Sequence, residues 1–172
     1  SQANDFKSQS YSTAMWVNRN NFSGIYGNLL ELGNSTTSSH YLRFFYSGGV
    51  YYLQAGHYNL SPAGGNNMQI STTNLFGQGE WVMLGMSSDY NSVSGNRTIK
   101  IYVDGAEVSS QNFTTNTSIL YDANYARLNI GHRDGSPSMY FDGKIDGLTY
   151  YNRAISAQEM ATYYHACPYV AS

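Results

Sequence analysis

Two aspartates near the end of the chain, Asp142 and Asp146, lie on either side of a Gly-Lys-Ile step in the stretch FDGKIDGLTYYNRAISAQEM. Carboxylates serve as acid and base in glycoside hydrolysis, and they are preferred oxygen ligands of Ca²⁺. A strand-like segment and a helix start follow directly, so the two acids could instead order the junction between strand and helix. Asp142 and Asp146 therefore allow three interpretations: a catalytic pair, a metal site, or residues that order the fold.

Other residues that could carry out chemistry are scattered along the chain. His40, His57, His132 and His165 form no His-x-x-x-His pair, and the single cysteine, Cys167, rules out a Cys-x-x-Cys motif. Because zinc sites are built from Cys and His at such short spacings, the sequence does not support a zinc site. The sequence also contains no Gly-x-Ser-x-Gly stretch that would expose a nucleophilic serine.

The stretch at residues 40–59 is rich in aromatic residues and offers a different chemistry. Its first part has the pattern of two strands joined by the turn Ser47-Gly48-Gly49, and successive side chains of a strand alternate between its two faces. Some rings must therefore point away from the core, where aromatic faces can pack against the C–H faces of sugars. Plain sheet packing is the alternative. The ligand-binding residues predicted from this stretch are Tyr46, Tyr51, Tyr52, His57 and Tyr58.

The composition favours binding through hydrogen bonds and ring stacking rather than through charge. Charged residues make up 12% of the chain, about half the usual share, whereas 17 of its 172 residues are tyrosine. A net charge of −2 with nine Lys and Arg residues provides no basic stripe for nucleic acid. No apolar run is long enough to span a membrane. The polar, nearly cysteine-free chain predicts an extracellular or cell-surface location.

Alternation with a period of two predicts strands along almost the whole chain. One helical segment is expected after Tyr151, where Ser156 and Glu159 have the spacing of a capping box. No repeat, linker or second compositional zone divides residues 1–172, so we predict a single all-β domain, an antiparallel sandwich with one short C-terminal helix. Strands are expected at 11–19, 26–34, 68–72, 80–88 and 145–151 and around an inward-pointing Leu128 and Ile130, hairpins at 40–56 and 97–113, and a loop at 57–67.

Several of these stretches also carry a family resemblance. In chain order they are YSTAMWVN, GEWVMLGMSSD, IKIYVDGAEV with its Asp-Gly tip, LNIGHRDG, and a closing Phe-x-Gly-x-Ile-Asp stretch followed by an aromatic strand and a Ser-x-x-Glu helix start. Together, over residues 10–164, they resemble the laminin-G-like and pentraxin-like branch of the concanavalin A-like jelly rolls. The resemblance implies a concanavalin A-like β-sandwich, a fold that carries lectins, adhesins, enzymes and spacers.

The resemblance also bears on the two aspartates. It implies that Gly143 permits close backbone approach, that Ile145 enters the core, and that Asp146 orders a turn by hydrogen bonds. A calcium ligand is the second interpretation of Asp146, since some relatives hold a structural ion through carboxylate and carbonyl oxygens. We expect Asp142 to point to solvent.

The stretch GHRDGS, residues 131–136, occupies the place where pentraxins carry several calcium-binding acids and amides. His132 and Arg133 depart from that pattern and are predicted to contact the ligand, whereas Asp134 retains a suitable carboxylate. One calcium ion held by Asp134, a second acid such as Asp89 or Asp122, and backbone carbonyls is one interpretation. A simple turn at Asp134-Gly135 is the other, and both stay open.

Catalysis is the less favoured interpretation of this chain. Glycosidases of this fold carry a Glu-x-Asp-x-x-Glu strand, and the glutamates at 31, 80, 107 and 159 form no such stretch. The segment YYLQAGHYN is similar to the Tyr-x-Lys-Ala-Gly-x-Tyr strand of alginate lyases. In a lyase of this kind, His57 or Tyr58 of the present chain could act as the general base. However, Gln54 replaces the lysine, and the companion Arg-x-Glu-x-Arg and Gln-x-His strands are missing.

We therefore expect a non-catalytic carbohydrate-binding or adhesion module of a secreted or surface protein. Its expected partner is a glycan or polysaccharide, and calcium is the one cofactor that the sequence suggests. A polysaccharide-active enzyme of the lyase kind and a structural module that binds a cell-surface protein are the two alternatives.

Overall fold

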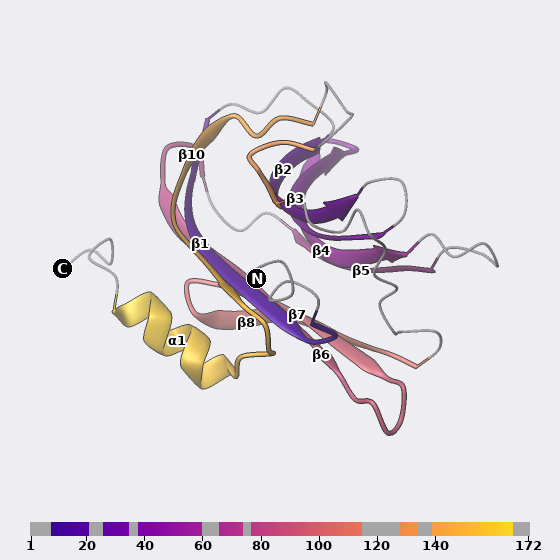
Figure 1. The fold of residues 1–172 in the computed structure, drawn as a ribbon. Helices are drawn as coiled ribbons and strands as arrows, with labels where there is room; N and C mark the ends of the chain where they lie inside the picture. The colour runs from indigo at the N-terminus through magenta and orange to yellow at the C-terminus, as the bar shows by residue number, and fades with distance from the viewer. Residues whose placement is uncertain are drawn as a thin grey trace.

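A computed structural model of the chain describes residues 8–20, 26–34, 38–59, 66–73, 77–114, 128–133 and 139–166. These residues form two antiparallel five-stranded sheets that face each other, with one helix outside them (Figure 1). Sheet A has the strand order β10-β1-β6-β7-β8, and sheet B has the order β5-β4-β3-β2-β9. The predicted antiparallel sandwich with a short C-terminal helix is confirmed.

Sheet A consists of β1 (Tyr11–Arg19), β6 (Trp81–Tyr90), β7 (Arg97–Val103), β8 (Ala106–Phe113) and β10 (Gly143–Tyr151). Sheet B consists of β2 (Tyr26–Asn34), β3 (Ser38–Ser47), β4 (Val50–Asn59), β5 (Asn66–Thr73) and β9 (Leu128–Ile130). The helix α1 covers Ala157–His165. Within the described ranges, no helix has both the length and the apolar character needed to cross a lipid bilayer.

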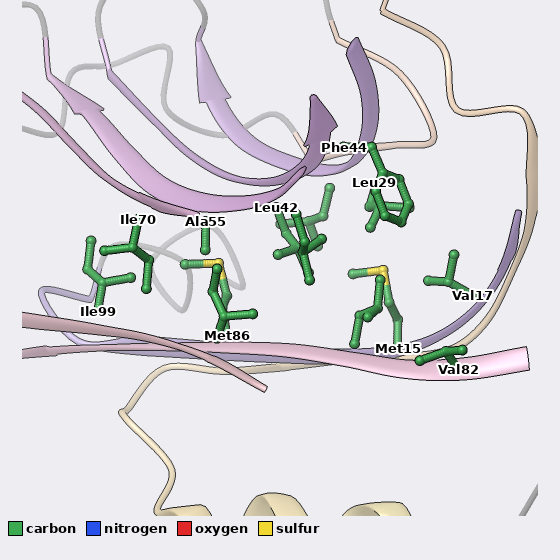
Figure 2. Close-up of a cluster of buried hydrophobic side chains, with 14 of the residues drawn as sticks. Met15, Val17, Leu29, Leu42, Phe44, Ala55, Ile70, Val82, Met86 and Ile99 are labelled. Carbon is green, nitrogen blue, oxygen red and sulfur yellow. The ribbon is translucent and has the colours of Figure 1, made fainter. Parts of the chain in front are cut away.

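The core lies between the two sheets and is filled by the alternate side chains that the sequence pattern assigns to one face. Figure 2 shows Leu42, Phe44 and Ala55 of sheet B pointing toward Met15 and Met86 of sheet A. Since such burial contributes about 25 cal/mol per Å² of apolar surface, this interior supplies most of the energy that holds the two sheets face to face.

The outer face of sheet A is covered by α1. Trp16 of β1, Met83 of β6 and Tyr102 of β7 form a second buried cluster there with Ile155 and Met160. The predicted capping box is present at the helix start, where the Ser156 side chain accepts from the Glu159 amide and the Glu159 carboxylate accepts from the Ser156 amide. Among the described residues, no helix covers the outer face of sheet B.

One local prediction was wrong, and one pair of residues is more exposed than expected. Residues 57–59, expected in a loop, continue β4, and Asn66 and Asn67 already belong to β5. Leu128 and Ile130, expected to point inward, pair with the buried Leu32 and Leu30 and so lie on the inner face of sheet B, yet they are 40% and 46% exposed. They belong to a three-residue strand at the edge of sheet B, and an edge position leaves one side of each residue without a neighbouring strand.

Candidate functional site

The outer face of sheet B carries the side chains that alternate with its core residues. On β3, Leu42 and Phe44 are core residues, so Tyr41, Arg43 and Phe45 lie on the outer face. The same alternation on β2, β4, β5 and β9 brings further polar and aromatic groups to this face. We call the following residues the Arg43 cluster: Tyr26, Asn28, Glu31, Tyr41, Arg43, Gln54, Gln69, Asn129 and Arg133.

Tyr41 lies across β4 because that strand has a glycine at the crossing point. Gly56 pairs with Tyr41 in the β3–β4 ladder, and a Cβ atom at Gly56 would lie 2.8 Å from the Tyr41 hydroxyl oxygen. The missing side chain lets the Tyr41 hydroxyl reach β5, where it donates to Gln69 Oε1 over 3.0 Å. Burial raises the pKa of Tyr41 to about 12, so this phenol stays protonated and neutral.

Arg43 is held between two aromatic rings. Its guanidinium carbon lies 4.3 Å from the ring centroid of Tyr41 and 4.6 Å from that of Tyr26, and its Nε donates to Gln54 Oε1 over 3.1 Å. Burial lowers the pKa of Arg43 below its usual value, yet a guanidinium keeps its charge in proteins. Among the described residues, Gln54 is its one hydrogen-bond acceptor. The two terminal nitrogens are therefore available to a ligand.

A second guanidinium and a buried carboxylate lie beside Arg43. Arg133 Nε is 3.5 Å from Glu31 Oε1, and Asn28 Nδ2 donates to Glu31 Oε2 over 3.3 Å. Glu31 is only 2% exposed. Two further amide atoms, Asn28 Oδ1 and Asn129 Nδ2, are buried without a hydrogen-bond partner among the described residues. Such atoms cost free energy, which a hydrogen bond from a ligand or water would recover.

The charges of this cluster favour an anion. Arg43 and Arg133 carry two positive charges against the one negative charge of Glu31. Because both guanidiniums are partly removed from water, their attraction for an anion is screened less than on an open surface. A planar carboxylate is the group that a guanidinium binds through two parallel hydrogen bonds. The arrangement can therefore hold a carboxylate, with amide and phenol groups around it for further polar contacts.

The three predicted tyrosines are divided between two faces. Tyr52 lies on the outer face of sheet B, where its ring centroid is 5.9 Å from that of Phe45. Tyr46 and Tyr51 lie on the opposite face of the sheet, and their ring centroids are 4.7 Å apart at the tip of the β3–β4 hairpin. Arg19 of β1 contacts Tyr51 there, with 4.7 Å between guanidinium carbon and ring centroid. Of the three, Tyr52 alone shares a face with the Arg43 cluster.

His57, predicted to bind ligand and considered as a general base, lies inside the sandwich. It is 0% exposed, and its Nδ1 is 3.0 Å from Nδ1 of the equally buried His40. Burial, together with the charge of Arg97, lowers the pKa of His57 to about 3. The prediction that a surface ligand contacts His57 needs correction, because residue 57 continues β4 and alternation turns it inward. The side chain of Tyr58 lies outside the described residues.

Of the three predicted site residues in the stretch GHRDGS, residues 131–136, the structure describes His132 and Arg133, and these two do not lie together in one site. Arg133 joins the Arg43 cluster through its contact with Glu31. His132 stacks on Tyr140, with ring centroids 6.1 Å apart, and its Nδ1 lies 3.3 Å from the carbonyl oxygen of Ile130. Asp134, the predicted calcium ligand, lies outside the described residues, so its role stays a prediction.

Asp146 lies at a β-bulge between β10 and β1. Its Oδ1 accepts from the Gly147 amide over 2.7 Å, and Gly147 has a positive φ of 58°. The Tyr163 hydroxyl donates to the Gly147 carbonyl, which ties the bulge to α1. The folding role expected for Asp146 is confirmed. No group of three or more His, Cys, Asp or Glu side chains suited to a metal ion occurs within the described ranges, so calcium binding at Asp146 also stays a prediction.

Sequence reasoning missed most of the Arg43 cluster. One signal was available, since the strand SSHYLRFFYS places Tyr41, Arg43 and Phe45 on one face by simple alternation. No local spacing could have added Glu31 or Asn129, because they belong to β2 and β9 and meet through strand pairing.

Comparison with known proteins gives one family and several solved structures. The model of the concanavalin A-like lectin/glucanases superfamily matches residues 1–161, whereas no curated protein sequence matches the chain. The chain is similar in structure to the CBM40 module of the Ruminococcus gnavus IT-sialidase bound to α2,3-sialyllactose, with a TM-score of 0.67 and 13% identity. The match covers 92% of this chain and 84% of that chain.

Two other solved structures share the fold. The NanB sialidase from Streptococcus pneumoniae gives a TM-score of 0.67 at 25% identity, over 90% of this chain and 24% of that chain. This chain thus spans about a quarter of that sialidase. A heptameric SAP-like pentraxin from Limulus polyphemus gives a TM-score of 0.56 at 15% identity, over 91% of this chain and 70% of that chain, in agreement with the pentraxin-like pattern of the sequence.

Proposed function

The chain belongs to the concanavalin A-like lectin/glucanases superfamily, and from that premise we propose that it is a carbohydrate-binding module that holds an acidic sugar on the outer face of sheet B. The sugar carboxylate would pair with Arg43 and Arg133. The sugar hydroxyl and amide groups would bond to the neighbouring polar side chains. Sialic acids, which carry one carboxylate on each sugar ring, are the class of acidic sugar that we infer.

The observation that carries this proposal is the way in which Arg43 is held. Two tyrosine rings and Gln54 fix its guanidinium on the face of the sheet. Little side-chain freedom is therefore lost when a carboxylate binds, and this loss is one of the main costs of association. Asn28 and Asn129 support the proposal as well, because each has a buried amide atom that a sugar hydroxyl could satisfy.

The structural comparison supports the choice of sugar. The Ruminococcus gnavus module, which has the same fold, is bound to α2,3-sialyllactose in its structure. We propose a non-catalytic role in a secreted or surface protein, where the module would attach its parent protein to sialylated glycans. The Arg43 cluster itself requires no metal, so a calcium ion at Asp134 is a separate proposal.

Isothermal titration calorimetry with 3′-sialyllactose and with lactose tests the proposal. The wild-type protein should bind 3′-sialyllactose much more tightly than lactose, which lacks the carboxylate. Arg43→Gln should weaken sialyllactose binding by roughly ten- to a hundredfold, because hydrogen bonds to charged groups contribute about 1.5–3 kcal/mol each.

Arg153→Gln is the matched control. Arg153 also lies over a tyrosine ring, with its guanidinium carbon 5.8 Å from the Tyr151 centroid, but it pairs with Glu159 on the helix side of sheet A. This variant should bind like the wild type. Equal affinity for lactose and sialyllactose would contradict the acidic sugar, and undiminished binding by Arg43→Gln would contradict the site.

A further inference from the structure

The guanidinium of Arg43 and four aromatic rings on the outer face of sheet B form one continuous ladder of ring contacts. It runs from Tyr41 to Arg43 at 4.3 Å, on to Tyr26 at 4.6 Å, then to Phe45 at 5.0 Å and to Tyr52 at 5.9 Å, measured between ring centroids and the guanidinium carbon. The strand register produces this order, since Tyr26 pairs with Phe45, and Phe45 pairs with Tyr52. The ladder therefore has a charged end at the Arg43 cluster and an aromatic end on β4.

Tyr52 is the last ring of this ladder. Phe45 is its one ring neighbour within the described part of the chain. On its other side, β5 places the exposed Thr73 directly in register with Tyr52, and the exposed Ser71 in register with Gln54. Both β5 residues have short side chains that end in a hydroxyl or methyl group. The aromatic end thus combines a half-buried ring with two neighbouring exposed side chains that carry hydroxyl groups.

A ring face beside hydroxyl groups suits a neutral sugar. The C–H face of a pyranose packs against an aromatic π face, while serine and threonine hydroxyls bond to sugar hydroxyls. Arg43 pairs with Gln54, so Tyr52 is its diagonal neighbour across the two strands, roughly 7–8 Å away. A disaccharide that lies across β3 and β4 would therefore contact both side chains.

We propose that Tyr52, with Thr73 and Ser71, forms a second subsite that binds the neutral sugar linked to the acidic sugar at Arg43. The inference rests on the proposed function and extends it, because the module then recognises a disaccharide unit rather than a single acidic ring. Linkages that lay the C–H face of the second sugar on the Tyr52 ring are the ones that this subsite favours.

Titration with two ligands separates the two subsites. The methyl glycoside of N-acetylneuraminic acid occupies the Arg43 subsite alone, whereas 3′-sialyllactose adds a galactose next to the acidic sugar. The wild-type protein should bind 3′-sialyllactose roughly two- to tenfold more tightly than the methyl glycoside, the range expected for one aromatic contact. Tyr52→Ala should lose this advantage and retain its affinity for the methyl glycoside.

Tyr46→Ala is the matched control for Tyr52→Ala. Tyr46 lies on the same hairpin and contacts Tyr51 at a similar distance, 4.7 Å between ring centroids, but on the opposite face. Its removal should change neither affinity. Thr73→Val, which removes the hydroxyl and preserves the shape of the side chain, should weaken 3′-sialyllactose binding alone.

Four results would overturn the second subsite. Equal affinity of the wild type for both ligands, or an advantage of 3′-sialyllactose that survives Tyr52→Ala, would leave the Arg43 site intact and exclude the role of Tyr52. An equal loss of both ligands in Tyr52→Ala would assign Tyr52 to the support of Arg43 instead. Binding of neither ligand by the wild type would overturn the proposed function and this inference with it.

Discussion

Acidification should destabilise this protein through two histidines that are buried in its core. His40 and His57 are both 0% exposed, and their Nδ1 atoms are 3.0 Å apart, so one neutral ring can donate to the other. Tyr11 of β1 packs on His40, and the charge of Arg97 of β7 acts on both rings. Burial is the main reason that the pKa of His40 lies well below 6.5 and that of His57 lies at about 3.

The size of the effect follows from the difference between the folded and unfolded states. The unfolded chain takes up a proton on each histidine as the pH falls through 6.5, whereas the folded chain does not until the pH approaches the lowered pKa. Each full pH unit below 6.5 therefore removes about 1.4 kcal/mol per histidine from the free energy of unfolding. Between pH 7 and pH 5 His57 alone accounts for about 2 kcal/mol, and His40 adds to the loss in the same direction.

Urea unfolding at pH 7, 6 and 5, followed by circular dichroism, measures this loss. The double variant His40→Gln/His57→Gln should lose less free energy of unfolding between pH 7 and pH 5 than the wild type, because glutamine does not titrate. The comparison is made within each variant, so a lower starting stability does not affect it. His165→Gln, at an exposed position on α1, is the control. If the double variant loses as much as the wild type, the buried pair is not the cause and the reasoning is wrong.

Two further predictions concern the binding face and the calcium ion. Gly56→Ala should place a methyl group against the Tyr41 hydroxyl. Overpacking should then lower the free energy of unfolding by about 1–3 kcal/mol, and 3′-sialyllactose should bind more weakly. An unchanged unfolding midpoint and an unchanged affinity would show that Tyr41 is not held as described. A calcium ion that binds only the folded protein should give a higher melting temperature in calcium than in a chelator. Asp134→Ala should abolish this difference. If the wild type melts at the same temperature in both solutions, the calcium site is excluded.

Features that depend on a few neighbouring residues could be predicted from the sequence. Alternation within β1 places Met15 and Trp16 on opposite faces, and the structure puts Met15 in the core between the sheets and Trp16 in the cluster beneath α1. The Asp104-Gly105 pair forms the tip between β7 and β8, with both residues at positive φ. The capping box of Ser156 also formed as its spacing indicated. In each case the sequence pattern that predicts the feature lies within a turn or along a single strand.

Features that depend on pairing between distant strands were predicted poorly. His57 looked accessible because glycine, asparagine and proline follow it in the sequence, yet the ladder between β4 and β5 extends past it and turns it into the core. Arg133 was singled out for its place in a rim loop, but its charge partner, Glu31, could not be inferred, since the two residues lie far apart along the chain.

The sequence by itself determined the sandwich, its turns and the set of side chains that shares a face within each strand, because a period of two and local turn chemistry decide these. Only the tertiary structure decided which face is open to a ligand. Contacts of Trp16 and Met83 with Met160 place α1 on the outer face of sheet A, whereas no helix in the described part of the chain covers the outer face of sheet B. The register of β2, β3 and β9 then brings Glu31, Arg43 and Arg133 together, and that register is set by packing across the whole core rather than by any local spacing.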